Sequence, residues 1–166
     1  MKTLLFLLVL TSLTAWGQQP ASASNPPVAG MATGEEIVKR ANVITLHTAD
    51  SANVAYTKLA RLLLAEGYVL DKADRELGFV NTGYHHSANR AVEVALRVVV
   101  VPNPAGALVE VRGVSRMPGM SHTLVGGDSP IEYRGMSGSP AMLAWEAMAR
   151  LAATYHAPQT TCKRQL

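Results

Sequence analysis

The chain has 166 residues, 48% of them hydrophobic, and a formal net charge of +3 at pH 7. This length is enough for one domain with a substantial core. The small charge is not concentrated in any cluster of Lys and Arg, so the sequence gives no indication of a nucleic acid partner. A single cysteine, Cys162, cannot form an internal disulfide, so packing alone must stabilise the fold.

The first 17 residues have the pattern of a cleavable export signal. Lys2 precedes an apolar run over Leu4–Leu13, which is too short to span a bilayer, since spanning takes roughly 20 apolar residues. Ala15 and Gly17 are small residues at the positions that a signal peptidase recognises. We therefore expect cleavage between Gly17 and Gln18, and a secreted or periplasmic product with no transmembrane segment in the mature chain.

Residues 18–37 are expected to form a flexible linker, because they are rich in Pro, Ala, Ser and Gly and show no apolar periodicity. The alternatives to a cleaved signal are an uncleaved anchor and a buried helix, and this composition argues against the helix. No cysteine directly follows the apolar run, so the lipid anchor of a lipoprotein is not predicted. Residues 38–157 are the predicted domain. Residues 158–166 are a predicted polar tail, in which Cys162 is an exposed thiol.

The domain opens with a predicted strand and a predicted helix. Residues 42–48 are rich in β-branched residues, which is typical of a strand. Asp50 or Ser51 can supply an N-cap oxygen, and from Ala52 onward apolar residues recur at helical spacing. Gly67 follows at the point where a helix end favours a residue that tolerates positive φ.

The middle of the domain predicts four strands. Residues 68–72 and 77–83 form two short strands around a polar turn, and residues 91–101 form a long one. A Pro-rich turn leads into a partner strand at 107–116, which completes a hairpin. Alternation places one apolar set on a single face of the long strand: Val92, Val94, Leu96, Val98 and Val100.

Residues 117–138 are a long loop-like region, and a loop of this length either is functional or contains further structure. Short strands are possible at 122–125 and 131–134. A second helix is predicted over 139–156, with Ser139 as its cap and a proline at its first position. Its expected buried stripe comprises Ala141, Ala144, Trp145, Met148, Ala152 and Tyr155.

The predicted order is therefore β-α-β-β-β-β-α. An antiparallel sheet with both helices on one face buries each apolar stripe, so we expect an α+β two-layer sandwich.

Ser137 is the candidate nucleophile. The segment Gly135–Pro140 resembles the sequence around the catalytic serine of chymotrypsin-like proteases, and His47 and Asp50 precede it in the matching chain order. However, that fold needs two β-barrels, and its motif continues into a strand, whereas Ser137 precedes a predicted helix. The segment also lacks the second glycine of an α/β-hydrolase nucleophile elbow. A Gly-rich turn before a Ser-Pro helix start accounts for these residues.

His85 and His86 are the histidines considered for metal binding. Adjacent residues on a strand point to opposite faces, so the two would not bind one ion together. The chain has neither the two-histidine helix motif nor the cysteine pair of a zinc site. The Gly-rich run at 126–130 leads into an extended segment and not into a helix, so a phosphate site is not predicted either. We predict no metal and no cofactor.

Tyr84 and Tyr133 lie in or beside predicted loops and could line a pocket, together with His85 and His86. Trp145 lies on a helical stripe and is expected to pack in the core.

The strand and helix over Asn42–Gly67, the meander Tyr68–Arg116 and the closing helix with Trp145 resemble helix-grip or TBP-like domains of bacterial envelope proteins. One such group is the domains of the outer-membrane assembly lipoprotein C. The resemblance covers residues 38–156 and rests on topology, and the chain departs from that group in lacking the lipidated cysteine. It implies a non-catalytic role in envelope interactions and transfers no site residues.

Three functions remain open from the sequence. The favoured one is a non-enzymatic exported domain that binds a protein partner or an envelope component. The second is a carrier of a small apolar ligand near Tyr84 and Tyr133, and the third is a hydrolase that uses Ser137 or a His-based site. A cavity lined by small residues under the second helix would favour the carrier. A filled interface would favour the interaction module, and its expected residues are Val92, Val94, Leu96, Trp145 and Met148.

Overall fold

The computed structural model describes residues 38–87, 90–119 and 127–165. The elements in chain order are β1 (Val43–Thr48), α1 (Ala52–Ala65), β2 (Leu70–Asp74), β3 (Phe79–Thr82), β4 (His85–His86), β5 (Glu93–Asn103), β6 (Gly106–Arg116), β7 (Ser129–Pro130), α2 (Pro140–Tyr155) and β8 (Gln159–Lys163). The predicted export signal at 1–17, the predicted linker at 18–37 and the possible strand at 122–125 lie outside the described residues.

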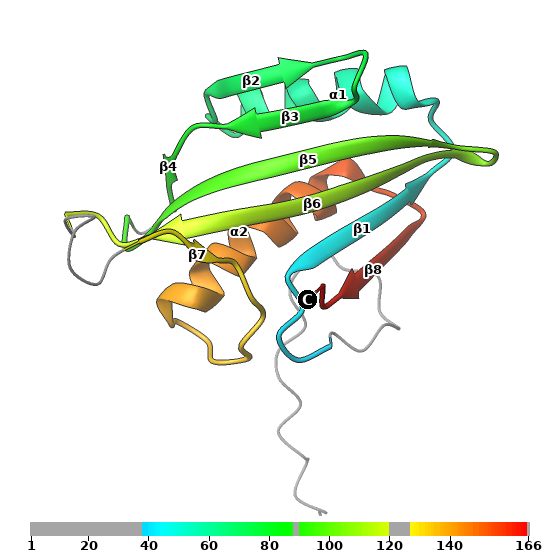
Figure 1. Ribbon diagram of the computed structural model, residues 1–166. Helices are drawn as coiled ribbons and strands as arrows, with labels where there is room; N and C mark the ends of the chain where they lie inside the picture. Colours follow the sequence, from blue (N-terminus) through cyan, green and yellow to red (C-terminus); the bar gives the residue numbers. More distant parts are fainter. Residues whose placement is uncertain (1–37, 88–89, 120–126, 166) are drawn as a thin grey trace, which may run out of the picture.

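The strands form one antiparallel sheet in the order β2-β3-β5-β6-β1-β8, while β4 pairs with β5 and β7 pairs with β6. Both helices pack on the same face of this sheet and contact each other, as Figure 1 shows for α1 behind β2 and β3 and α2 behind β6. The predicted α+β class, the antiparallel sheet and the placement of the helices are confirmed. We call the face under the helices the inner face and the opposite one the outer face.

Local sequence signals explain the start of α2 and the end of α1. Ser139 accepts a hydrogen bond from the Met142 amide at the start of α2, as expected of an N-cap, and Pro140 follows it. The helix α1 ends at Ala65 with Glu66 as its C-cap, and Gly67 then takes a φ of +87°. A Cβ at this glycine would also lie 3.2 Å from the His85 ring, so both conformation and space favour glycine there.

The β5–β6 hairpin is longer and tighter than predicted. Its ladder continues to the pairs Pro102–Ala107 and Asn103–Gly106, so the turn is shorter than the predicted Pro-rich loop. Pro102 is tolerated because its nitrogen faces the side of β5 that carries no partner strand beyond Val99. Gly106 has a φ of +137°, and a Cβ there would lie 2.1 Å from the Thr48 carbonyl oxygen.

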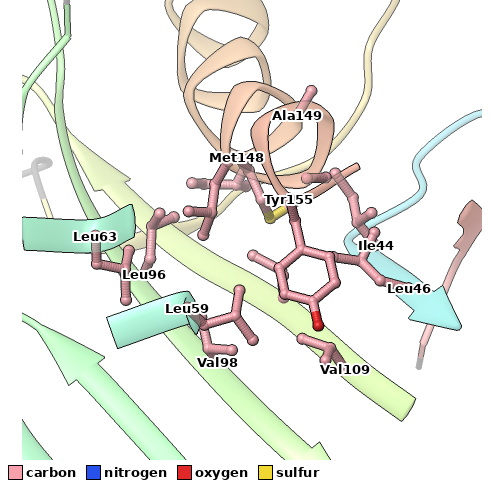
Figure 2. Close-up of a cluster of buried hydrophobic side chains, with 14 of the residues drawn as sticks. Ile44, Leu46, Leu59, Leu63, Leu96, Val98, Val109, Met148, Ala149 and Tyr155 are labelled. Carbon is pink, nitrogen blue, oxygen red and sulfur yellow. The ribbon is translucent and has the colours of Figure 1, made fainter. Parts of the chain in front are cut away.

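The inner face and the helices enclose a filled apolar core. Figure 2 shows Leu59 and Leu63 of α1 and Met148 and Tyr155 of α2 converging on the strands. The predicted stripe of α2 is buried, apart from half-buried Ala141. The five residues expected to fill the interface are all at most 2% exposed: Val92, Val94, Leu96, Trp145 and Met148.

The prediction of a polar tail at 158–166 is wrong, because Gln159–Lys163 forms the edge strand β8, which pairs antiparallel with β1. An edge strand with one face toward solvent needs few apolar residues, so composition did not reveal it. Cys162 is half-buried against the core, so the expectation of an exposed thiol is also wrong.

The strand that the sequence allowed at 131–134 does not form there, and a shorter one lies just before it. The paired segment is Ser129–Pro130, and the following residues bond elsewhere: Ile131 donates to the Gly113 carbonyl and Tyr133 to the Ala41 carbonyl.

Within the described ranges, no helix is long and apolar enough to cross a membrane.

Trp145→Ala should lower the free energy of unfolding by about 3–5 kcal/mol, because Trp145 is fully buried and its removal leaves a cavity. Urea unfolding followed by circular dichroism measures this. The neighbouring Glu146→Ala variant is the control and should change stability by less than about 0.5 kcal/mol. Similar values for the two variants would place Trp145 outside the core.

Candidate functional site

The outer face of the sheet is not covered by either helix, and it carries a groove of about 540 Å³ that is open to solvent. Its floor comes from β1, β3, β5 and β6, and residues of β7 and the C-terminal segment add to its rim. The lining residues are Asn42, Val43, Asn81, Thr82, Ala95, Leu96, Arg97, Arg112, Gly113, Val114, Pro130 and Gln165. A groove of this size is within the range of known ligand sites.

Strand register brings three polar side chains into one row across this groove. Asn81 pairs with Arg97, and Arg97 pairs on its other side with Arg112. The adjacent pair Val98–Val111 is buried in the core, so strand alternation places these three residues on the outer face. Directly opposed residues of an antiparallel pair have Cβ atoms roughly 4.5–5.5 Å apart, so the two arginines are close neighbours of like charge.

Glu110 holds one end of this row. Its carboxylate accepts hydrogen bonds from Lys163 Nζ and Arg112 Nη2, each at 2.7 Å. The hydrogen bond from Lys163 is the largest cause that lowers the pKa of Glu110 below its ordinary value, and Arg112 adds to the effect. Arg97 has an exposed guanidinium and forms no ion pair with any residue that the structure describes.

Two acceptor oxygens on the outer face lack a donor. Asn81 Oδ1 and Thr45 Oγ1 are both buried, and neither has a hydrogen-bond partner among residues 38–87, 90–119 and 127–165. Thr45 precedes Leu46, which points into the core, so alternation places Thr45 on the outer face. Buried polar atoms in native proteins are nearly always paired, so each of these oxygens can accept a bond from outside the described chain.

An apolar patch borders the polar row toward the hairpin turn. Phe79 pairs with Val99 on the outer face, and Val101 pairs with Leu108. Phe79, Val99 and Leu108 are half-buried, while Val101 is 45% exposed. The outer face therefore combines apolar contact area with positive charge.

The other end of the outer face holds a closed polar cluster. Arg116 stacks on the Tyr84 ring, with 3.7 Å between the guanidinium carbon and the ring centroid, and it donates a hydrogen bond to Glu93. His86 Nε2 lies 3.6 Å from the same carboxylate. Burial raises the pKa of Tyr84 to about 12, and the Asp128 carboxylate adds to the shift. Both Arg116 and His86 therefore lie beside the Glu93 carboxylate, unlike Arg97 in the groove, which forms no ion pair among the described residues.

His85 lies on the inner side of the sheet, opposite to His86. Its neighbour in the ladder is Val94, a core residue, and its ring centroid lies 4.8 Å from that of Tyr68. The two histidines thus point to opposite faces, as the sequence predicted. A cavity of about 80 Å³ beside them is also lined by Glu66 and Arg150. In the part of the chain that the structure describes, no three His, Cys, Asp or Glu side chains converge in a metal-binding arrangement.

Tyr84 and Tyr133 lie on different sides of the sheet. Tyr133 packs edge-on against Trp145, with 5.6 Å between the ring centroids, whereas Tyr84 stacks with Arg116 on the outer face. Tyr133 is therefore a core-packing residue.

Ser137 is exposed in the turn before α2 and lies far from the residues that would activate it. His47 pairs with Gln159, which follows the other end of α2. A helix of 16 residues is roughly 24 Å long. Asp50 instead accepts a 2.8 Å hydrogen bond from Tyr155. The structure does not assemble these residues into a catalytic triad.

The groove residues Asn81, Arg97 and Arg112 were not singled out from the sequence. The predicted alternation already placed Arg97 and Arg112 away from the core, which was the available signal. Their meeting depends on the β5–β6 register, which sequence periodicity alone does not provide.

No known protein-family model matches the chain. No curated protein matches it either. The resemblance to domains of the outer-membrane assembly lipoprotein C therefore stays a prediction, and function must be argued from the geometry of the outer face.

Glu110→Gln should destabilise the protein by about 1 kcal/mol at neutral pH, since it removes charge-assisted bonds to two half-exposed cations. The folded-state pKa is lowered, so this contribution is complete above the ordinary value of 4.5 and is lost as pH falls through the lowered pKa. Urea unfolding over a pH series should therefore show the free energies of unfolding of the wild-type and variant proteins converging below pH 4.5. Glu76→Gln, at an exposed carboxylate, is the control, and a pH-independent difference at Glu110 would contradict the prediction.

Ser137→Ala should leave stability and surface properties unchanged, and the protein should not react with a fluorophosphonate probe above background. Ser139→Ala is the matched control, because loss of the N-cap bond should cost about 1 kcal/mol. Probe labelling that depends on Ser137 would reinstate the hydrolase hypothesis.

Proposed function

We propose that this protein is an exported, non-enzymatic binding module that contacts a protein partner or an envelope component through the outer face of its sheet. The observation that carries the proposal is the contrast between the two faces. The inner face is filled by large side chains, whereas the outer face keeps an open groove in which Arg97 and Asn81 Oδ1 have no partner among the described residues. Export rests on the N-terminal sequence pattern, and the envelope role agrees with the topological resemblance described above.

The filled core disfavours a carrier of a small apolar ligand. Such a ligand would need space between the sheet and the helices, and that space is occupied by residues that include Leu96, Trp145 and Met148. Creating a cavity there would remove packing that stabilises the fold. The tyrosines proposed to line such a pocket also lie on different sides of the sheet.

The arrangement of polar groups also disfavours catalysis. A hydrolase needs a nucleophile and a base within hydrogen-bond reach, and Ser137 and His47 lie near opposite ends of α2. The groove offers cations and acceptors that can position a ligand, and the described residues that line it include no Ser, Cys, His, Asp or Glu.

Site-specific photo-crosslinking tests the binding face with two matched valines. Val101 lies on the outer face and is 45% exposed, while Val54 lies on α1 and is 53% exposed. With a benzophenone amino acid at each position, crosslinks to an envelope component should form from position 101 and not from 54. Excess unlabelled protein should compete them away. Crosslinks from position 54 alone would move the binding surface to α1 and overturn the proposal.

A further inference from the structure

We infer that the groove binds an extended acidic peptide segment, with a ligand carboxylate placed between Arg97 and Arg112. The inference rests on the proposed function and specifies the partner's chemistry. It follows from three features of the groove, namely its charge, its one acceptor without a partner among the described residues, and its shape.

The charge of the row is unbalanced. Arg97, Arg112 and Lys163 are three cations, and the only carboxylate bonded to any of them is Glu110, within the part of the chain that the structure describes. Glu110 already accepts from Lys163 and Arg112, so Arg97 remains without a counter-ion beside a second guanidinium. Like charges directly opposite in a sheet are unfavourable, and an anion between them reverses the sign of that interaction. Guanidinium groups bind carboxylates in a planar, bidentate geometry.

An unpaired acceptor stands beside that cation. Asn81 is the direct cross-strand neighbour of Arg97, and its Oδ1 is buried with no donor among the described residues. A ligand that pairs with both side chains must therefore present an N–H group close to a carboxylate. An acidic residue within a peptide does so, since its backbone amide and its side-chain carboxylate belong to one unit.

The shape of the groove favours a chain over a small acid. The groove is an open depression across several strands, and its floor beside the arginines is lined by small or apolar residues such as Ala95, Val114 and Val43. Small-molecule sites usually bury 70–90% of their ligand, roughly, and an open sheet face cannot enclose a small acid in that way. An extended peptide can cover the arginines and continue onto the apolar patch near Val101.

Fluorescence anisotropy with a labelled peptide of alternating Glu and Ser tests the inference on the full chain. This peptide should bind at least roughly tenfold more tightly than the matched Gln–Ser peptide, with affinity falling as salt increases. Arg97→Gln and Arg112→Gln should each weaken binding by roughly tenfold. Asn81→Asp should weaken it similarly, because the new carboxylate would pair with Arg97 itself.

The control variant is Arg61→Gln, which removes one positive charge from the exposed side of α1 and should change affinity by less than about twofold. Arg97→Gln should not lower the thermal midpoint, because Arg97 has no ion pair in the described structure to lose. Equal binding of the two peptides, or equal losses in the Arg61 and Arg97 variants, would overturn the inference.

Vesicles containing phosphatidylglycerol form a separate arm. Binding that depends on Arg97 should occur with the acidic peptide and not with the vesicles, and the reverse result would overturn the choice of a peptide. If the peptide fails to bind while the crosslinks from position 101 persist, the ligand class is wrong and the binding face stands. If both fail, the proposed function fails with the inference.

Discussion

The register of the β5–β6 hairpin is the constraint on which the rest of the molecule depends. Eleven residue pairs run from Glu93–Arg116 to Asn103–Gly106 without interruption. This register sends Val98 and Val111 into the core and leaves Arg97 and Arg112 together on the outer face. A slip by one residue in either strand would exchange those two sets. The close approach of Gly106 to the Thr48 carbonyl helps to fix the turn, because no larger residue fits there.

The same register places the stabilising apolar core and the candidate binding residues on opposite faces of the sheet. The apolar core lies between the sheet and the helices, where Trp145 and Tyr155 are fully buried. The outer face carries the polar row of Asn81, Arg97 and Arg112, and some of its groups have no partner within the described structure. Glu110 is held by two cations, yet Arg97 forms no ion pair and Asn81 Oδ1 has no hydrogen-bond partner within the described structure. Buried polar atoms without partners are costly, and Asn81 Oδ1 is one such atom among the described residues.

Much of this fold could be predicted from local patterns, and the failures have a physical basis. Alternation in β5 and the apolar stripe of α2 predicted the core, because burial on one face leaves a periodic trace. The edge strand β8 left no such trace, since Gln159–Lys163 is polar and its pairing with β1 is a long-range interaction. The candidate site was missed for a similar reason. Arg97 and Arg112 look like ordinary exposed residues until the register sets them opposite each other, whereas Ser137 attracted attention through a local motif that the tertiary structure does not complete.

The position of β1 also affects how the chain can fold. This strand lies between β6 and β8, so Ile44 pairs with Val111 on one side and with Cys162 on the other. Both partners come much later in the sequence, and strand pairing over such separations is slow because the loop must close before the contacts form. The first strand therefore stays unpaired until most of the domain has emerged. The sheet can therefore be completed only after residues 159–163 have been synthesised, because β8 pairs with the first strand of the domain.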